Sequence, residues 1–204
     1  MSSDAPSLFD AATEDGGSVV DDPTRPLADR LRPRALDDVV GQDNLLAPDA
    51  PLGRMIASGH LSSIILWGPP GCGKTTIARR LADRTGLAFD QVSATFSGVA
   101  DLRKVFTAAA RRRGIGQGTL LFVDEIHRFN RAQQDSFLPY VEDGTVVLVG
   151  ATTENPSFEL NGALLSRCQV MVLRRLDEAA LTELLARAES LMGRSLALTE
   201  DART

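Results

Sequence analysis

The stretch Gly68-Pro69-Pro70-Gly71-Cys72-Gly73-Lys74-Thr75 decides the fold, because it matches the phosphate-loop pattern G-x-x-x-x-G-K-[ST]. The apolar run Ile64–Trp67 precedes the loop and is typical of a buried parallel strand, while residues 74–85 have helical character. In this setting the glycines let backbone N–H groups turn toward phosphate oxygens, and the helix N-terminus adds a partial positive charge. The loop, with Thr76 after it, is therefore predicted to bind the phosphates of a nucleotide.

Two side chains of the loop have specific predicted roles. Lys74 is expected to reach the β- and γ-phosphates, and the Thr75 hydroxyl is expected to ligate Mg²⁺. Cys72 occupies a free position of the pattern, where it is either a small spacer or a redox-sensitive thiol. The predicted cofactors are ATP and Mg²⁺.

An acidic motif supplies the rest of a hydrolytic site. The apolar run Leu120–Val123 ends in Asp124 and Glu125, which describes a buried strand that delivers two carboxylates to the carboxyl edge of a parallel sheet. Asp124 is predicted to hold the Mg²⁺ shell, and Glu125 is predicted to orient the attacking water. His127 is read as a polar residue leading out of the strand, since it lacks a second ligand at metal-binding spacing. Together with the loop, these residues predict an ATP hydrolase.

Apolar runs alternate with stretches of helical spacing, which predicts an α/β fold: a five-stranded parallel sheet with helices on both faces. The predicted strands are Ile64–Trp67, Phe89–Ser93, Thr119–Val123, Val146–Gly150 and Val170–Leu173. The predicted helices are Leu52–Gly59, 74–85, Val99–Arg113 and Ala132–Val141. A further helix is predicted after the sheet from residues that can share one apolar face, which are Leu176, Ala180, Leu184 and Leu191. Thr199 is a candidate cap for another helix.

The chain divides into three predicted parts. Residues 1–24 hold six acidic side chains and no Lys or Arg, which indicates a disordered acidic tail. Residues 25–175 are predicted to form the nucleotide-binding core, and residues 176–204 the start of a helical lid that is incomplete in this chain. The whole chain has a net charge of −5, but the part after residue 24 carries 22 basic and 21 acidic side chains. A near-neutral body needs a local cationic patch to bind nucleic acid.

Composition favours a cytoplasmic protein. The apolar run Ile64–Trp67 is far too short to cross a bilayer, and no membrane partner is predicted. Asp4 stands where a signal peptide carries positive charge, and no apolar stretch follows it. The two cysteines, Cys72 and Cys168, fit a reducing compartment and make no disulfide framework or metal quartet.

Four further runs resemble those of a known family. Leu36–Gln42 looks like the adenine-side segment of AAA+ ATPases, and Gly150–Glu159 looks like their sensor-1 strand and loop. Leu165–Cys168 matches the Ser-Arg-Cys segment of clamp-loader-type AAA+ proteins. With Asp124–Asn130, these runs make residues 25–191 resemble the replication-associated recombination protein A family, the bacterial relatives of the WRN-interacting ATPase.

The resemblance implies roles for residues outside the two motifs. Val40 and Gly41 would pack near adenine, and Thr153, or Thr152 beside it, would sense the γ-phosphate. Arg167 would act in the neighbouring subunit's site as an arginine finger, which implies a homo-oligomer. The family continues into a helical lid with a second sensor Arg, which would lie beyond the end of this chain.

The same resemblance implies what the ATPase acts on. It suggests an AAA+ motor of the nucleoid that couples MgATP hydrolysis to DNA remodelling in replication-associated recombination and repair, at stalled forks or gaps. A clamp-loader-type subunit, a branch-migration motor and an adaptor that binds nucleotide without cycling are the alternatives. Arg111–Arg113 is either a DNA patch or a set of cations that ends a helix. Leu8 and Phe9 resemble a weak sliding-clamp peptide, and the alternative is an inert acidic tail.

Overall fold

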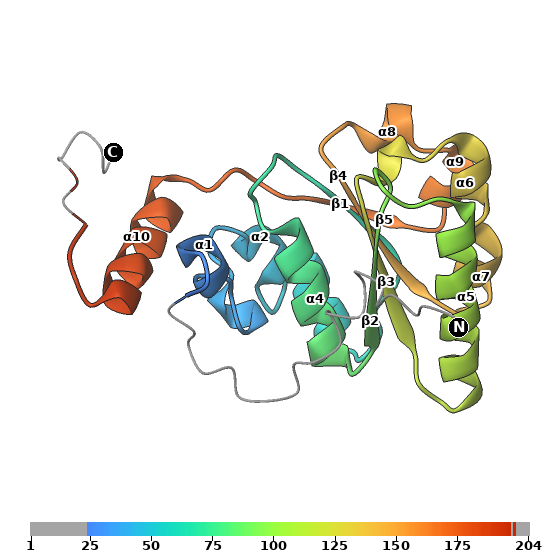
Figure 1. The fold of residues 1–204 in the computed structure, drawn as a ribbon, viewed down its shortest axis with the longest axis horizontal. Helices are drawn as coiled ribbons and strands as arrows, with labels where there is room; N and C mark the ends of the chain where they lie inside the picture. Colours follow the sequence, from blue (N-terminus) through green and yellow to red (C-terminus); the bar gives the residue numbers. More distant parts are fainter. Residues whose placement is uncertain (1–23, 197, 199–204) are drawn as a thin grey trace, which may run out of the picture. The chain divides into compact units, whose positions relative to one another are not determined.

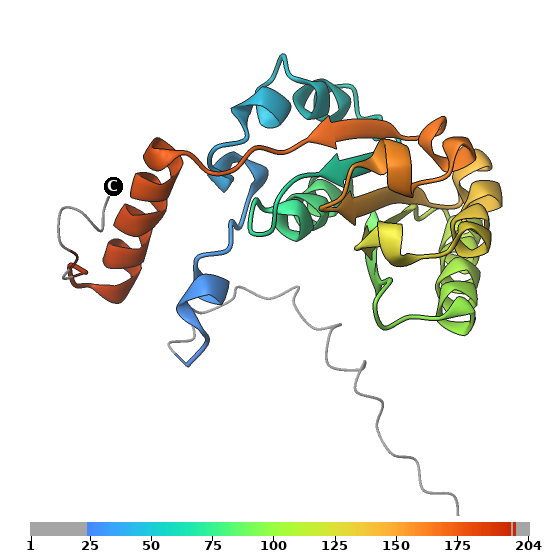
Figure 2. The ribbon, with the colours of Figure 1, turned by 90° about the horizontal axis from the view of Figure 1, so that it is seen from above.

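The computed structural model describes residues 24–196 and residue 198. At its centre is a five-stranded sheet in the order β2-β3-β4-β1-β5, and every pairing is parallel. The strands are β1 Ile64–Trp67, β2 Ala88–Ser93, β3 Thr119–Asp124, β4 Val147–Thr152 and β5 Gln169–Val172. Figure 1 and Figure 2 show helices on both faces of this sheet, so the predicted α/β fold is confirmed.

Each face of the sheet has its own apolar layer, as expected for strands that are covered on both sides. The helices around it are α2 Asp43–Leu46, α3 Pro51–Ala57, α4 Lys74–Thr85, α5 Val99–Gly114, α6 Arg131–Asp135, α7 Leu138–Glu142, α8 Pro156–Glu159 and α9 Gly162–Leu165. One layer holds Leu52 of α3 and Leu81 of α4 against β1, β3 and β4. The other layer holds Phe106 of α5, Leu164 of α9 and Phe137, which directly precedes α7. The carboxyl edge of the sheet is thereby fixed by packing on both sides.

The prediction of one helix over Ala132–Val141 is wrong, because the chain forms two short helices there, α6 and α7. Pro139 lies in the first turn of α7, where an N–H group has no intrahelical acceptor in any case. Inside a continuous helix, Pro139 would leave the Asp135 carbonyl without its donor, and its ring would clash there. The chain therefore ends α6 at Asp135 and starts α7 at Leu138.

The chain separates into two compact units, one ending at Arg32 and the other beginning at Pro33. The described part of the first unit holds α1, Leu27–Arg30. Asp29 in this helix pairs with Arg25 at 2.5 Å and with Arg32 at 2.8 Å. The hydrogen bond from Arg25 lowers the pKa of the Asp29 carboxyl.

In the second unit, α10, Glu178–Met192, follows the sheet. The Asp177 side chain caps this helix by accepting a hydrogen bond from the Ala180 N–H at 2.9 Å. Among the residues predicted to share its apolar face, Ala180 is buried, while Leu184 and Leu191 are half-buried.

Several predicted features lie outside the described residues. These are the acidic stretch up to residue 23, with Leu8 and Phe9, and the candidate helix cap Thr199. Within the described ranges, no helix combines the length and the apolar character needed to cross a bilayer.

Candidate functional site

Three segments leave the sheet at the same edge, and their convergence builds the site. β1 ends at Trp67, which lies opposite Thr152 at the end of β4. Val123 of β3 lies opposite Gly150, so Asp124 reaches the edge one residue later. Because the strands are parallel, the phosphate loop, the turn after Asp124 and the end of β4 meet at the carboxyl edge of the sheet, where open α/β folds bind ligands.

The phosphate loop is shaped by glycines at three positions. Gly71 and Gly73 have φ angles of 77° and 96°, which are left-handed values that favour glycine. At Gly68 the reason is space, because a Cβ there would lie 2.8 Å from the Leu173 carbonyl oxygen. The helix α4 begins directly after the loop at Lys74, so its first N–H groups face the loop.

The Lys74 side chain is 8% exposed and points back into the loop. Its ammonium donates to the carbonyl oxygens of Gly68 at 2.7 Å and Pro69 at 2.9 Å, and it lies 4.0 Å from the Cys72 sulfur. Burial raises the pKa of the Cys72 thiol, and the Lys74 charge opposes this only in part. A thiol that stays protonated is a poor nucleophile, which favours the spacer interpretation of Cys72 over the redox-sensitive one.

Glu125 has a strained backbone. In the described part of the chain it is the one non-glycine residue with positive φ, at φ 51° and ψ 44°. Such a conformation costs about 1–3 kcal/mol, and residues that adopt it cluster at functional sites. The Asp124 carboxylate accepts a hydrogen bond from the Glu125 N–H at 3.1 Å, and the Glu125 carbonyl accepts one from the Arg128 N–H at 2.8 Å. These contacts hold the predicted water-orienting residue in a tight turn.

The absence of a side chain at Gly150 lets the turn after Glu125 pack closely against β4. The fully buried Ile126 begins the 3-10 helix η3, Ile126–Arg128, and packs over β4. A Cβ at Gly150 would lie 2.9 Å from Ile126 Cδ1 and 2.8 Å from Ile65 Cδ1. Because Ile126 directly follows Glu125, this close packing anchors the strained residue to the sheet.

His127 connects Glu125 to the end of β4, a contact that the sequence reading missed. Its Nδ1 lies 2.9 Å from the Thr152 hydroxyl oxygen, and its Nε2 lies 3.4 Å from a Glu125 carboxylate oxygen. The local signal was only a histidine two residues after the acidic pair. Its partner Thr152 is 25 residues away in the chain, so the contact depends on the fold.

The two sensor candidates differ in their surroundings. Thr152 is fully buried, and its hydroxyl is engaged with His127 and with the backbone of Glu154. Thr153 is half-buried, and no hydrogen bond within the described residues occupies its hydroxyl. Of the two, Thr153 therefore has the hydroxyl that is open to a further hydrogen-bond partner.

The predicted adenine-side segment is fixed to the residues that lead into α10. Gly41 has a φ of 71°, and a Cβ there would lie 3.0 Å from Leu176 Cδ2. The fully buried Gln42 exchanges two hydrogen bonds with the backbone of Arg174, at 2.9 and 3.2 Å. Val40, beside them, is half-buried. The predicted adenine-side segment is therefore packed directly against the residues that lead into α10.

Two predicted magnesium ligands suit an ion that is held together with a nucleotide. Thr75, in the first turn of α4, and Asp124, at the end of β3, are both half-buried. Mg²⁺ usually takes one or two protein oxygens beside phosphates and waters, so one hydroxyl and one carboxylate fit it. Within the described residues, no group of three or more His, Cys, Asp or Glu side chains could hold a metal without such help.

Arg167 is paired within its own chain. Its Nε lies 2.5 Å from a carboxylate oxygen of Glu142, and its Nη1 donates to the Ala163 carbonyl at 2.8 Å. Both charged side chains are more than a third exposed, so the pair contributes little to stability. The described contacts of Arg167 include no residue of the phosphate loop and neither Asp124 nor Glu125. A single chain therefore does not bring Arg167 into the site.

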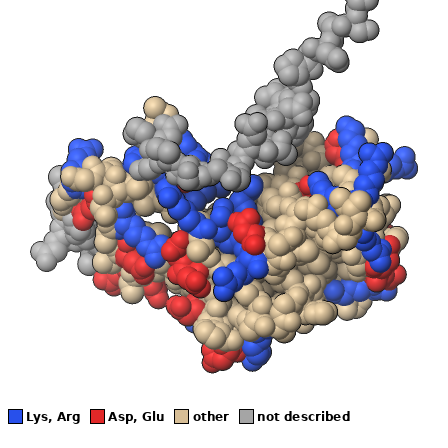
Figure 3. Space-filling view, turned by 90° about the horizontal axis from the view of Figure 1, so that it is seen from below, with Lys and Arg blue, Asp and Glu red and all other residues tan. Residues whose placement is uncertain are grey.

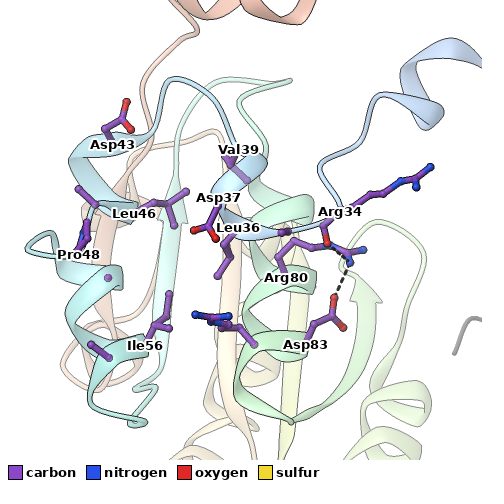
Figure 4. A pocket seen from close by; sticks show the side chains of 15 residues that line it. Arg34, Leu36, Asp37, Val39, Asp43, Leu46, Pro48, Ile56, Arg80 and Asp83 are labelled. Atoms are coloured by element: carbon purple, nitrogen blue, oxygen red, sulfur yellow. Dashed lines mark hydrogen bonds and ion pairs between the residues drawn. The ribbon is translucent and has the colours of Figure 1, made fainter. Parts of the chain in front are cut away.

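A hollow of about 640 Å³ lies beside the C-terminal half of α4. Figure 4 shows Arg80 of α4 reaching toward Asp83 and the Arg34 carbonyl at this hollow. Its lining includes no residue between 68 and 76. The hollow therefore lies apart from the phosphate loop, although Leu36, Asp37 and Val39 of the predicted adenine-side segment line it.

The arginines Arg111–Arg113 are largely engaged in pairs. Arg112 donates to both carboxylate oxygens of Asp90, at 2.6 and 3.0 Å, and Arg113 lies 3.3 Å from Asp143. Figure 3 shows one face of the molecule, on which Lys and Arg side chains are interspersed with Asp and Glu. These pairings favour the helix-ending interpretation of the three arginines over a DNA patch.

Comparison with known proteins identifies the protein family to which the chain belongs. Residues 64–176 match the family described as ATPase family associated with various cellular activities (AAA). This match covers more than half of the chain, so the protein belongs to the AAA family. Replication-associated recombination protein A is 55% identical over 163 residues in Coxiella burnetii and 51% identical over 168 residues in Escherichia coli K12. ATPase WRNIP1 of Dictyostelium discoideum is 46% identical over 181 residues. The resemblance drawn from the motifs is confirmed.

These relatives are longer than the present chain. The matches cover 80% and 82% of this chain, but 37% of the Coxiella protein and 38% of the Escherichia protein. The match to WRNIP1 covers 87% of this chain and 21% of that protein. Among solved structures, the Holliday junction branch migration motor RuvB of Thermotoga maritima has a TM-score of 0.65 at 32% identity, covering 80% of this chain and 55% of that one. This likeness agrees with the sheet described above.

Proposed function

We propose that the chain binds MgATP and hydrolyses it at the carboxyl edge of the sheet. The observation that carries the proposal is the meeting, at this edge, of the phosphate loop with the strained Glu125. Strain of this kind is retained where geometry serves chemistry, and here it falls on the residue proposed to orient the attacking water.

Each part of the site has a proposed role. The loop Gly68–Thr76 holds the phosphates through its N–H groups and Lys74, and Thr75 with Asp124 holds Mg²⁺. The bound ion would neutralise charge that develops on the phosphates. Glu125 orients water, Thr153 senses the γ-phosphate, and Val40–Gly41 packs against adenine.

Hydrolysis is proposed to be completed between subunits of a homo-oligomer. Arg167 is paired with Glu142 in its own chain and has no described contact with the phosphate loop, Asp124 or Glu125. The nucleotide site on which it would act is therefore proposed to be that of a neighbouring subunit. An arginine finger that stabilises the charge of the transition state is worth roughly 10³–10⁵ in rate. Arg167 would exchange Glu142 for the γ-phosphate when two subunits meet.

The hydrolysis is proposed to drive DNA remodelling in replication-associated recombination and repair, at stalled forks or gaps, in the cytoplasm at the nucleoid. The names of the relatives at 51–55% identity support this assignment. The likeness to RuvB favours a branch-migration motor as the second candidate. A clamp-loader-type subunit and a nucleotide-binding adaptor are further alternatives, and the adaptor alone predicts no hydrolysis in a single-turnover assay.

The test of this assignment compares DNA structures. ATP hydrolysis is measured with forked, gapped, four-way and linear duplex DNA at equal nucleotide concentration. Forked or gapped DNA should stimulate most, while strongest stimulation by the four-way junction would favour the branch-migration candidate. Equal rates with and without every DNA would contradict a DNA-coupled role.

A contact between the tail and a sliding clamp is also proposed, through Leu8 and Phe9. Burying each side chain could return roughly 1.5–3 kcal/mol, and the ordering of the peptide on binding would reduce this. A labelled peptide of residues 1–15 should bind the clamp of the same organism, and the change of Leu8 and Phe9 to Ala should abolish binding. No binding at high clamp concentration would leave the inert tail as the answer.

A further inference from the structure

Thr152, His127 and Glu125 form a connected row from the end of β4 to the turn after β3. The Thr152 hydroxyl oxygen lies 2.9 Å from His127 Nδ1, and His127 Nε2 lies 3.4 Å from a Glu125 carboxylate oxygen. Thr152 is fully buried and the His127 side chain is 12% exposed, while the Glu125 side chain at the end of the row is 27% exposed. Polar contacts are stronger in such surroundings than in water.

The hydrogen bonds of Thr152 are compatible with a proton on either nitrogen of the His127 ring. The Thr152 hydroxyl accepts from the Glu154 N–H at 3.0 Å, and its proton and second lone pair serve His127 Nδ1 at 2.9 Å and the Glu154 carbonyl at 3.2 Å. The contact with His127 is the shorter one. If Nδ1 accepts, the neutral ring carries its proton on Nε2, which is the nitrogen facing Glu125.

The opposite tautomer would be unfavourable here. With the proton on Nδ1, the Nε2 lone pair would face the Glu125 carboxylate oxygen across 3.4 Å, and both groups are acceptors. The Glu125 carboxylate therefore favours the neutral form with the proton on Nε2, and the Thr152 hydroxyl can donate to the Nδ1 lone pair of this form. In this arrangement the Thr152 hydroxyl orients the His127 ring, and the ring orients the Glu125 carboxylate.

We propose that His127 is a positioning residue that holds the Glu125 carboxylate and couples it, through Thr152, to the neighbouring Thr153. This inference rests on the proposed function, in which Glu125 orients water and Thr153 meets the γ-phosphate. Thr152 and Thr153 are adjacent at the end of one strand, so a shift of this strand end on phosphate binding reaches Glu125 through one side chain. Phosphate binding at Thr153 would thereby change the position of the Glu125 carboxylate, which orients the attacking water.

The tautomer can be measured without any hydrolysis. The chain has two histidines, so His60→Gln leaves His127 as the only imidazole, and His60 is exposed. Nitrogen NMR of this variant at about pH 8 should show the proton on Nε2. Thr152→Val, which removes the hydroxyl at nearly constant shape, should lower the population of the Nε2 form, because only the Glu125 carboxylate then favours it, and Thr152→Ser should restore this population. If the His60→Gln variant, in which Thr152 is unchanged, carries the imidazole proton on Nδ1, the proposal is overturned. This result needs no substitution of a buried residue.

Two substitutions of His127 separate positioning from packing. Asn places its amide near the position of Nδ1, so His127→Asn keeps the Thr152 contact and loses Glu125, whereas Gln reaches the position of Nε2 and keeps a donor for the acid. His127→Asn should lower kcat by about 10- to 100-fold, a typical effect of misplacing a reacting group, with KM changed less than about 2-fold. His127→Gln should retain most of kcat. Equal losses in both variants, or full kcat in His127→Asn, would overturn the inference.

Failure of this inference can be told from failure of the proposed function. If Glu125→Gln hydrolyses ATP normally, the proposed role of Glu125 is wrong, and the positioning role of His127 falls with it. If Glu125→Gln is inactive while His127→Asn keeps full kcat, only the inference about His127 is wrong. Binding of a fluorescent ATP analogue should be unchanged in all of these variants, and its loss in His127→Asn would assign His127 to the binding site and overturn the positioning role.

Discussion

Gly150→Ala should perturb the candidate hydrolytic site through buried packing, because its new methyl group would meet Ile65 and Ile126 and neither residue is proposed to contact the nucleotide. Gly150 lies in β4 between β1 and β3. No left-handed φ prevents alanine there, so the effect comes from space alone. The new methyl carbon would lie 2.8 Å from Ile65 Cδ1 and 2.9 Å from Ile126 Cδ1, both fully buried, so both side chains must move. Since Ile126 follows Glu125, that movement should reach the water-orienting carboxylate.

The expected loss of stability follows from two opposing terms. Overpacking a core costs about 1–3 kcal/mol, and alanine regains about 0.4–1 kcal/mol by restricting the unfolded chain. A net destabilisation of about 1–2 kcal/mol corresponds to a fall in Tm of roughly 2–8 °C for a domain of this size. Calorimetry measures it, and a parallel ATPase assay should show a lower kcat.

A matched rescue tests the contact itself. Ile65→Val and Ile126→Val each remove the Cδ1 atom that the new methyl would meet, and alone each should cost about 0.5–1.5 kcal/mol. Combined with Gly150→Ala, they should be less destabilising than the sum of the single changes. A Gly150→Ala chain as stable as the parent, or strictly additive losses, would refute the packing argument.

Three further predictions follow. Mixing Arg167→Ala with Lys74→Ala should restore part of the ATPase activity that each lacks alone, and no rescue over a wide concentration range would contradict action between subunits. Gly41→Ala should lower stability by about 1–2 kcal/mol and weaken ATP binding, because alanine is strained at a φ of 71°; unchanged Tm and Kd would be the contrary result. Burial raises the pKa of Cys168 from 9.0 to about 12, so the folded chain binds this proton more tightly, and the stabilisation is complete below about pH 9 and is lost as the pH rises toward 12. The unfolding free energy of the chain relative to Cys168→Ala, measured by denaturant titration, should therefore fall over this range, and a constant difference would contradict it.

The parts of the fold that depend on local pattern were predictable from the sequence. The bounds of β1 and α4 match the prediction because a continuous apolar run, a glycine-rich loop and Gly86 after the helix mark both ends. Gly86 has a φ of 67° and caps α4, as expected of glycine at a helix C-terminus. The acidic pair was predictable for the same reason, since it ends an apolar strand.

The parts that depend on contacts between distant segments were not predictable. The contact of His127 with Thr152 requires that β3 and β4 lie side by side. The positive φ of Glu125 is a property of the backbone, and the residue types in this turn do not predict it. The pairing of Arg167 with Glu142 likewise joins residues 25 positions apart. The break between α6 and α7 was readable from Pro139, which the prediction of a single helix did not take into account.

The central claim, that Glu125 at this sheet edge turns a nucleotide-binding loop into an ATP hydrolase, is tested most directly by single-turnover hydrolysis with Glu125→Gln. This variant should bind MgATP with a Kd within about 2-fold of the parent, while the rate of phosphate release falls by about 10²-fold or more. Lys74→Ala, measured in parallel, should lose binding, which separates the two halves of the site. Hydrolysis by Glu125→Gln at the parent rate, with binding intact, would contradict the account.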